Sequence, residues 1–243
     1  MPTSDLRGEL RTRIRLALMA IGRHLNDGHL ANLRSVLSYL EIGRDLSHRA
    51  PDEQPVAVED YTDLFELALG RITGERPLYL EFGVFEGRSM RWWSSHLTAS
   101  GAHLIGFDSF QGLPEDWRPG LGTGHFATGQ PPDIADPRVR FVVGWFDETL
   151  PSFVAPAHDQ LIINIDSDLY SSALTVLNWA APLLRPGTLV YFDEYPDRDH
   201  EMRALAEYAR SSRFEFFPLG FARGGVHWLF EVRARPEQEI ASS

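Results

Sequence analysis

The sequence predicts an α/β fold, in which helices cover a mostly parallel β-sheet. From residue 77 onward, short apolar runs alternate with stretches of helical periodicity, which is typical of parallel strands joined by helical crossovers. Several of these runs end in an acidic residue or a glycine. Ligands of open α/β sheets bind beyond the carboxyl ends of the strands, so these residues are the first candidates for a functional site.

An N-terminal helical arm is predicted over residues 1–56. Apolar residues recur at helical spacing from Leu10 to Leu25, and again from Leu30 to Leu40. These stripes exceed what one flank of a domain is expected to cover. We therefore expect a homo-oligomer, with a dimer favoured, that uses these helices. The alternative is that both helices simply pack on the main domain.

The main domain is predicted over residues 57–236, and a C-terminal tail over 237–243. Its first helix is expected over 57–71, after a polar linker over 51–56. Five apolar runs are then expected to form parallel strands: PLYLEFGVF, HLIGFD, RVRFVVGWF, QLIINIDSD and GTLVYFDEY. Two more runs, RFEFFPLGF and GVHWLFEV, are joined by a short glycine turn and are predicted to pair antiparallel.

Composition limits the classes of partner. The chain of 243 residues has 23 basic and 34 acidic side chains, a net charge of −11, so we expect no nucleic-acid and no membrane partner. It has no cysteine, which excludes disulfides, thiolate metal sites and a cysteine nucleophile. Charges interrupt the apolar residues near the N-terminus, unlike in a secretory signal, and a cytoplasmic location is expected.

A long loop rich in glycine and proline is predicted over residues 111–136. Loops of this length inside a domain are commonly lids or binding loops. Trp117 and His125 lie in this loop and are candidates for substrate contact, and a surface role fits the sequence equally well.

The first strand is expected to end in a turn that binds a cofactor. Glu81 and Gly83 end the strand, and Gly87 and Ser89 begin the next helix. The spacing G-x-x-x-G differs from the G-x-G-x-x-G of dinucleotide sites, which disfavours a nicotinamide or flavin cofactor. Asp108 ends the second strand, 21 residues after Gly87, where a carboxylate can accept hydrogen bonds from the hydroxyls of an adenosine ribose.

Three or four carboxylates are expected to converge at the ends of two neighbouring strands. Asp166 and Asp168 follow the fourth run, and Asp193 and Glu194 follow the fifth. Carboxylates repel one another, so a cation is expected between them, and oxygen ligands suit Mg²⁺ or another hard divalent ion. The alternative is structural, with Asp168 capping the next helix and Glu194 solvated.

Five blocks of the sequence, in this order, resemble the TylF/MycF (macrocin O-methyltransferase) family of class I S-adenosylmethionine (SAM)-dependent methyltransferases. They are LEFGVFEGRSMRWW, GFDSFQGLPEDW, GWFDETLP, IDSDLYSSALTVL and RPGTLVYFDEY, and the resemblance covers about residues 60–232. It implies a Rossmann-like fold with a seven-stranded, mostly parallel sheet whose last strand is antiparallel. It also implies methylation of sugar hydroxyls on natural products such as macrolides, as in antibiotic biosynthesis.

The resemblance implies roles for individual residues. The implied SAM-binding residues are Glu81, Gly83, Gly87, Ser89, Asp108, Ser109, Gly144, Trp145 and Phe146. Among them, Asp108 is implied to hold the ribose. Mg²⁺ is implied at Asp166, Asp193 and Glu194. Many relatives have two aspartates where this chain has Asp193 and Glu194, so the longer side chain is expected to shift the second ligand.

The expected function is therefore SAM-dependent, Mg²⁺-dependent O-methylation of a sugar hydroxyl on a glycosylated small molecule. The ion would lower the pKa of the hydroxyl, and Asp166 is expected to act as the catalytic base. Three alternatives stay open. They are a non-sugar acceptor (catechol, polyketide or amine), a non-catalytic protein that retains the fold, and a metal-dependent glycosyltransferase, because Asp166 and Asp168 match a D-x-D motif.

Overall fold

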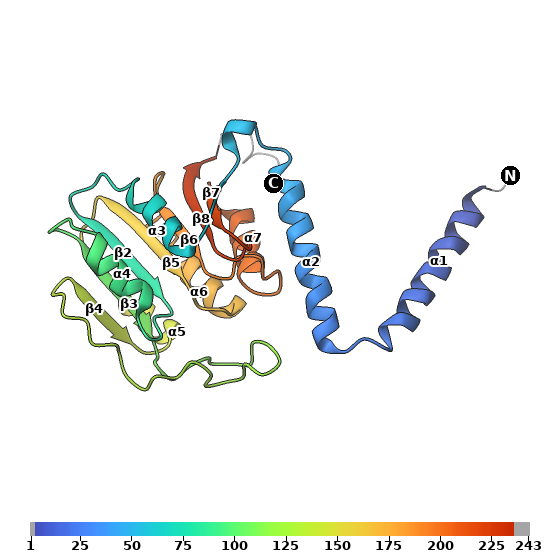
Figure 1. Cartoon of the computed structure of the whole chain (residues 1–243), viewed down its shortest axis with the longest axis horizontal. Helices are drawn as coiled ribbons and strands as arrows, with labels where there is room; N and C mark the ends of the chain where they lie inside the picture. Colours follow the sequence, from blue (N-terminus) through green and yellow to red (C-terminus); the bar gives the residue numbers. More distant parts are fainter. Residues whose placement is uncertain (1–2, 236–243) are drawn as a thin grey trace.

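Five parallel strands form the centre and one side of the sheet. They are β2 (Pro77–Phe82), β3 (His103–Asp108), β4 (Val139–Val143), β5 (Gln160–Ile165) and β6 (Leu189–Phe192). β2, β5 and β6 are buried at nearly every position, since helices cover both of their faces (Figure 1). The computed structural model describes residues 3–235.

Within residues 3–235 the sheet has eight strands in the order β1-β7-β8-β6-β5-β2-β3-β4, so the prediction of seven strands is wrong. The additional strand is β1 (Val56–Val58), which pairs parallel with β7 (Phe214–Ala222) at the edge of the sheet. Three residues are too few to show an alternating pattern, and they lie where a linker and a helix were expected. β8 (Trp228–Ala234) runs antiparallel to both β6 and β7, as predicted for the last strand.

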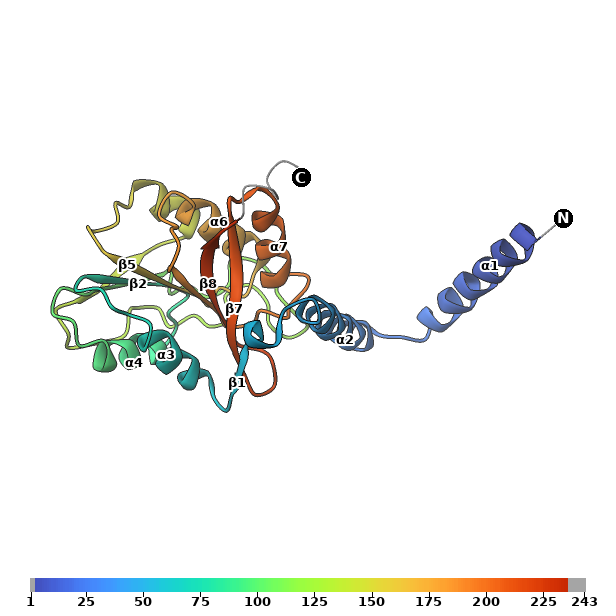
Figure 2. The same cartoon turned by 90° about the horizontal axis from the view of Figure 1, so that it is seen from above.

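Helices pack on the two faces of this sheet. α3 (Tyr61–Leu69) and α4 (Arg88–His96) lie on one face, and α6 (Tyr170–Ala180) and α7 (Glu201–Ser211) lie on the other (Figure 2). Each face therefore has its own apolar core, one with Leu64 of α3 and the other with Val176 of α6. Three short helices complete the body: 3-10 helix Pro51–Glu53, α5 (Phe146–Thr149) and 3-10 helix Leu150–Ser152.

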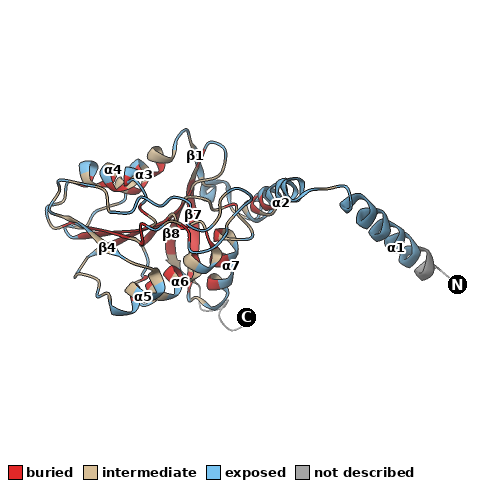
Figure 3. Cartoon of the chain, turned by 90° about the horizontal axis from the view of Figure 1, so that it is seen from below, coloured by how far each residue is buried: buried red, intermediate tan, exposed pale blue. Residues whose placement is uncertain are grey.

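Two long helices precede the body, α1 (Thr3–Gly22) and α2 (Asp27–Leu46). α2 contacts the body through Ile42, which is buried, and through Tyr39, whose hydroxyl donates to the carbonyl of Gly224 at 3.1 Å. α1 points away from the body, and its apolar residues from Leu10 to Ile21 are exposed (Figure 3). The predicted dimer and the predicted boundary at residue 56 stay predictions.

The remaining sequence predictions concern the membrane and the tail. Among residues 3–235, no helix is both long and apolar enough to cross a membrane. The predicted tail over 237–243 lies outside the described residues.

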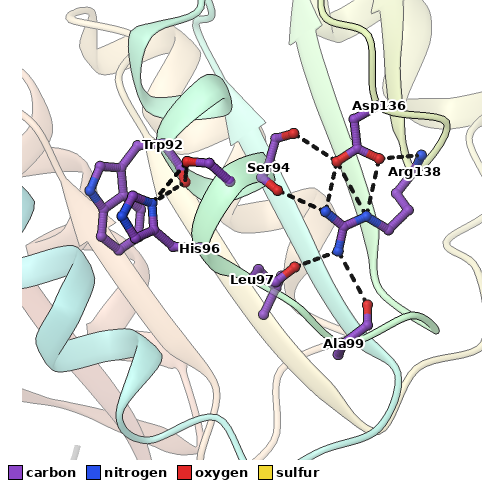
Figure 4. Close-up of polar contacts among 8 residues, drawn as sticks. Trp92, Ser94, His96, Leu97, Ala99, Asp136 and Arg138 are labelled. Carbon is purple, nitrogen blue, oxygen red and sulfur yellow. Dashed lines mark hydrogen bonds and ion pairs between the residues drawn. The ribbon is translucent and has the colours of Figure 1, made fainter.

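The loop of residues 111–136, from here on the lid loop, returns to the sheet at a partly buried ion pair (Figure 4). Asp136 accepts hydrogen bonds from Arg138 Nη2 and from Ser94 Oγ of α4, each at 2.7 Å. Arg138 also donates to the carbonyls of Ser94 and Leu97 at the end of α4. The guanidinium of Arg138 holds the pKa of Asp136 well below its usual range. The end of the lid loop is thus fixed to α4.

We expect Asp136→Asn to lower the free energy of unfolding by about 1–3 kcal/mol at pH 7, since Arg138 loses its anionic partner. The pKa of Asp136 is depressed in the folded protein, so its contribution is present above about pH 4 and is lost as the pH falls through the folded pKa. Urea denaturation should therefore show a smaller difference between variant and wild type at pH 3 than at pH 7. The control Asp133→Asn, at an exposed residue of the same loop, should change stability little at either pH.

Candidate functional site

A cavity of about 1060 Å³ lies at the carboxyl ends of the parallel strands, beneath the lid loop. Residues from the ends of β2, β3, β4, β5 and β6 all contribute to its wall, as does the lid loop from Gln111 to Phe126. The predicted site residues that line it are Gly83, Asp108, Ser109, Gly144, Trp145, Phe146, Asp166, Asp193 and Glu194. Glu81, Gly87 and Ser89 do not line the cavity.

The turn after β2 brings two strand ends into direct contact. Gly83 has a φ of 91°, and a Cβ at this position would lie 1.7 Å from the carbonyl oxygen of Asp166. The Asp166 amide in turn donates to the carbonyl of Phe82 at 2.9 Å. Only glycine fits here, because the position needs both a left-handed backbone and the space of a side chain. The G-x-x-x-G segment therefore lies directly beside the first carboxylate of β5.

Asp108 holds this turn from the neighbouring strand. Its Oδ2 accepts hydrogen bonds from the amides of Val84 and Phe85, at 2.8 and 2.9 Å. Its Oδ1 accepts one from the amide of Phe110 at 2.7 Å. A carboxylate has about four acceptor positions, so one position on Oδ1 stays available to a ligand. The sequence predicted contact with both ribose hydroxyls, and the structure leaves Asp108 room for about one such bond.

Glu81 is fully buried behind the turn. It accepts hydrogen bonds from the Tyr79 hydroxyl at 2.7 Å and from Ser89 Oγ at 2.9 Å. The Tyr79 hydroxyl accepts one from Asn164 Nδ2 at 3.1 Å. Burial raises the pKa of Glu81 to about 8. Glu81 and Ser89 thus join β2 to the start of α4, while Pro132 of the lid loop lies over Gly87.

Three of the implied SAM-binding residues, Gly144, Trp145 and Phe146, lie together after β4. The Gly144 amide donates to the carbonyl of Asp108 at 3.0 Å, which holds this turn against the end of β3. Trp145 and Phe146 follow at the start of α5 and line the cavity. An apolar slot beside Asp108 is the environment that a purine ring requires.

The opposite wall of the cavity is acidic. Asp166, Asp168, Asp193 and Glu194 all line it, so the structure brings the four carboxylates together. Burial and the charges of Asp193 and Asp168 raise the pKa of Asp166 well above its usual value. Burial and the nearby Glu194 and Asp193 raise the pKa of Asp168 to about 7. Asp168 has a φ of 60°, an uncommon conformation for a residue other than glycine.

Asp193 and Glu194 each have partners from other elements. Asp193 Oδ1 accepts from the Tyr191 hydroxyl and lies next to His227 Nδ1, both at 2.9 Å. Burial alone would lower the pKa of His227, but contact with Asp193 outweighs it and raises this pKa. Glu194 Oε2 lies 2.7 Å from Nη2 of Arg118, which comes from the lid loop.

These contacts bear on the predicted metal site. Carboxylate oxygens are suitable ligands for Mg²⁺, and four carboxylates line this wall of the cavity. Within residues 3–235, however, no three acidic or histidine side chains are grouped as a metal site. Glu194, one of the three predicted ligands, instead contacts the guanidinium of Arg118. The predicted ligands thus have the chemistry that Mg²⁺ requires, and Glu194 is paired with Arg118 in this structure.

Sequence reasoning missed a buried acid at this site. Glu201, the first residue of α7, is fully buried, and its Oε2 accepts from the Glu194 amide at 3.0 Å. Among residues 3–235, its other oxygen has no hydrogen-bond partner. Burial and the charge of Asp193 raise its pKa well above the usual value. No motif marks Glu201, and it resembles any acidic residue at the start of a helix.

The histidines of the site have structural contacts. Nδ1 of His200 accepts a hydrogen bond from the Tyr170 amide at 3.2 Å, so His200 connects the starts of α6 and α7. The ring of His125 packs edge-on against Phe126 in the lid loop. The ring of Trp117 lies under the guanidinium of Arg118, at 3.9 Å.

Comparison with solved structures shows the fold. The chain is similar to a crystal structure of the calicheamicin methyltransferase CalS11, with a TM-score of 0.54, 22% identity, and coverage of 70% of this chain and 76% of that one. It is also similar to the O-methyltransferase NovP, with a TM-score of 0.52, 23% identity, and coverage of 72% and 78%. The chain therefore has the Rossmann-like α/β fold of class I methyltransferases.

Comparison of sequences agrees over part of the chain. Residues 80–195 match the family model described as a methyltransferase domain. A segment of 62 residues is 42% identical to the 8-demethyl-8-(2,3-dimethoxy-alpha-L-rhamnosyl)-tetracenomycin-C 4'-O-methyltransferase of Streptomyces olivaceus, covering 26% of this chain and 23% of that protein. A segment of 100 residues is 33% identical to the demethyldecarbamoylnovobiocin O-methyltransferase of Streptomyces niveus, covering 40% and 36%. The matches thus span about a quarter to a third of these relatives.

We expect Glu201→Gln to stabilise the protein increasingly as the pH rises. The folded pKa of Glu201 is raised, so the wild type is most stable relative to the variant at low pH and loses stability as the pH rises toward that pKa. Glutamine cannot ionise and keeps an oxygen that accepts from the Glu194 amide. Urea denaturation should show the variant gaining at least about 1 kcal/mol on the wild type between pH 5 and pH 8.

The exposed Glu66 of α3 offers a matched control, because Glu66→Gln should show no such gain with pH. If the free energies of unfolding of wild type and Glu201→Gln differed by the same amount from pH 5 to pH 8, the raised pKa of Glu201 would be contradicted.

Proposed function

We propose that this chain is a SAM-dependent O-methyltransferase that acts on a hydroxyl of a natural-product small molecule, with a sugar as the acceptor group. One observation carries the proposal. A single cavity is lined by the turn of Gly83, by Asp108 and by Trp145 on one side, and by a group of carboxylates on the other. The first side suits an adenosine, and the second suits a reaction that removes a proton from a hydroxyl. The relatives named above methylate glycosylated or related compounds, which supports the same acceptor class.

On the cofactor side, the chain's residues would bind SAM with little rearrangement. Asp108 would accept a hydrogen bond from one ribose hydroxyl through the free position on Oδ1. Trp145 and Phe146 would pack on the adenine, with Ser109 beside them. Gly83 would allow the methionine part to pass close to the backbone, while Glu81, Gly87 and Ser89 would keep the turn in place from behind.

On the acceptor side, the carboxylates would orient the hydroxyl and take its proton. A hydroxyl oxygen forms a bond to the methyl carbon as the bond from that carbon to the sulfonium breaks, and the hydroxyl proton passes to a carboxylate. Asp166 in its ionised form is the base we propose, and the positive charge of a bound cation would favour that form. Asp168 lies beside it as a second carboxylate of the cavity wall. Mg²⁺ bound by Asp166, Asp193 and Glu194 would lower the pKa of the hydroxyl.

We expect the wild-type protein to bind S-adenosylhomocysteine, the product of SAM after methyl transfer, with a Kd of about 1 μM or lower in calorimetry. Asp108→Asn should weaken this binding by about tenfold to a hundredfold, since an amide in place of Oδ2 cannot accept from Val84 and Phe85. The control Asp116→Asn changes a lid-loop aspartate that bonds Thr123 and should leave the affinity within about twofold. Equal affinities of wild type and Asp108→Asn would place the cofactor elsewhere.

We expect methyl transfer from SAM to a glycoside in a panel that also contains the aglycone, a catechol and an amine. Asp193→Asn should lower kcat by at least about 10²-fold, because Asp193 is part of the charged wall facing the acceptor. Asp199→Asn, at an exposed aspartate of the same loop, should leave kcat unchanged. EDTA should abolish turnover, and added Mg²⁺ should restore it. Transfer only to the catechol or amine would favour the non-sugar alternative, and cofactor binding without transfer to any acceptor would favour a non-catalytic protein.

A further inference from the structure

Arg118 of the lid loop is the cation that the acidic wall of the cavity holds in this structure. Its Nη2 lies 2.7 Å from Glu194 Oε2 and 2.8 Å from Asp197 Oδ2. Its guanidinium is stacked on the ring of Trp117 at 3.9 Å, so the arginine is oriented from both sides. Bidentate or doubly paired arginines with a fixed plane lose less entropy on pairing than a free surface arginine.

The position of Arg118 depends on closure of the lid loop. Glu115 accepts a hydrogen bond from Ser171 Oγ of α6 at 2.6 Å. Phe126 packs edge-on against Phe85 of the cofactor turn, at a centroid distance of 5.5 Å. These contacts hold the segment on either side of Arg118 against the strand ends, and Arg118 contributes the charged contact among them.

We propose that Arg118 and a divalent cation compete for the carboxylate of Glu194, so that the lid closure seen here and a loaded cation site exclude each other. The proposal rests on the proposed function for the ligands of the ion, Asp166, Asp193 and Glu194. A hard divalent ion needs a carboxylate oxygen at about 2.1 Å and repels a second cation bound to the same carboxylate. Arg118 must therefore leave Glu194 before this oxygen can become a ligand.

Competition of this kind has a reciprocal consequence. If Arg118 lowers the affinity of the site for a cation by some factor, the cation weakens the contact of Arg118 by the same factor. Loss of Arg118 should tighten cation binding, and binding of the cation should loosen the lid loop around Arg118. The two effects are measured independently, and neither depends on catalytic activity.

The first experiment measures binding of Mn²⁺ alone, from the electron paramagnetic resonance signal of the free ion. Arg118→Gln should bind Mn²⁺ about fivefold to thirtyfold more tightly than the wild type. The matched control is Arg91→Gln. Arg91 donates to the carbonyl of Asp133 at 2.6 Å, so this variant also loses one positive charge and one lid-loop contact, but none with Glu194. Its affinity for Mn²⁺ should stay within about twofold of the wild type.

The second experiment measures hydrogen exchange of residues 113–126. Saturating Mn²⁺ should speed exchange in the wild type, whereas Arg118→Gln should exchange fast with or without Mn²⁺. The competition would be overturned if wild type and Arg118→Gln bound Mn²⁺ with equal affinity. It would also be overturned if Mn²⁺ slowed hydrogen exchange of the lid loop in the wild type or left it unchanged. Either result would leave the proposed function intact. Absence of Mn²⁺ binding in both proteins would overturn the competition together with the metal part of the proposed function, and calorimetry with S-adenosylhomocysteine would test the cofactor part separately.

Discussion

The gathering of carboxylates at one partly buried edge of the sheet is the constraint on which the site depends. Four carboxylates end two neighbouring strands, and Glu201 lies buried beside them. A buried carboxylate must be neutral, hydrogen-bonded or paired with a cation. The structure shows all three solutions: burial and neighbouring charges raise the pKa of Asp166, Asp193 bonds Tyr191 and contacts His227, and Glu194 binds Arg118. The carboxylates after β6 thus connect the lid loop, through Arg118, with the start of β8, through His227.

The cofactor side is fixed by backbone contacts rather than by charge. Gly83 allows two strand ends to approach, and Asp108 holds the turn that follows through two amides. These bonds exist without a ligand, so binding would not have to order the turn, and this lowers the entropic cost of binding. The cofactor wall is therefore held by contacts within the sheet edge, while Glu194 of the acidic wall is paired with Arg118 of the lid loop.

The strand ends and most of the cavity could be predicted from the sequence, since parallel strands with helical crossovers bring their carboxyl ends to one edge. Asp108, Asp166 and Asp193 line the cavity for this reason. His227 could not be predicted, because it reaches Asp193 only through the register in which Phe192 pairs with Trp228. A register is set by packing along whole strands and leaves no local motif.

Three other features escaped prediction for related reasons. Arg118 lies in a loop whose path follows from contacts at both of its ends, and its meeting with Glu194 spans 76 residues of chain. Glu201 begins a helix, where acidic residues are common without any special function. The eighth strand consists of three residues, fewer than a periodic pattern requires.

That short strand has a consequence for the solution behaviour of the protein. β1 covers the outer edge of β7 at Gly220, Phe221 and Ala222, and the Arg223 amide continues the contact by donating to the carbonyl of Val58. An uncovered edge of a long apolar strand offers free amides and carbonyls to any other extended chain, and is a common starting point for aggregation. Val56–Val58 therefore protects the outer edge of β7 from pairing with another chain. A shortened chain has to begin before residue 56 if this edge is to stay covered and the protein soluble.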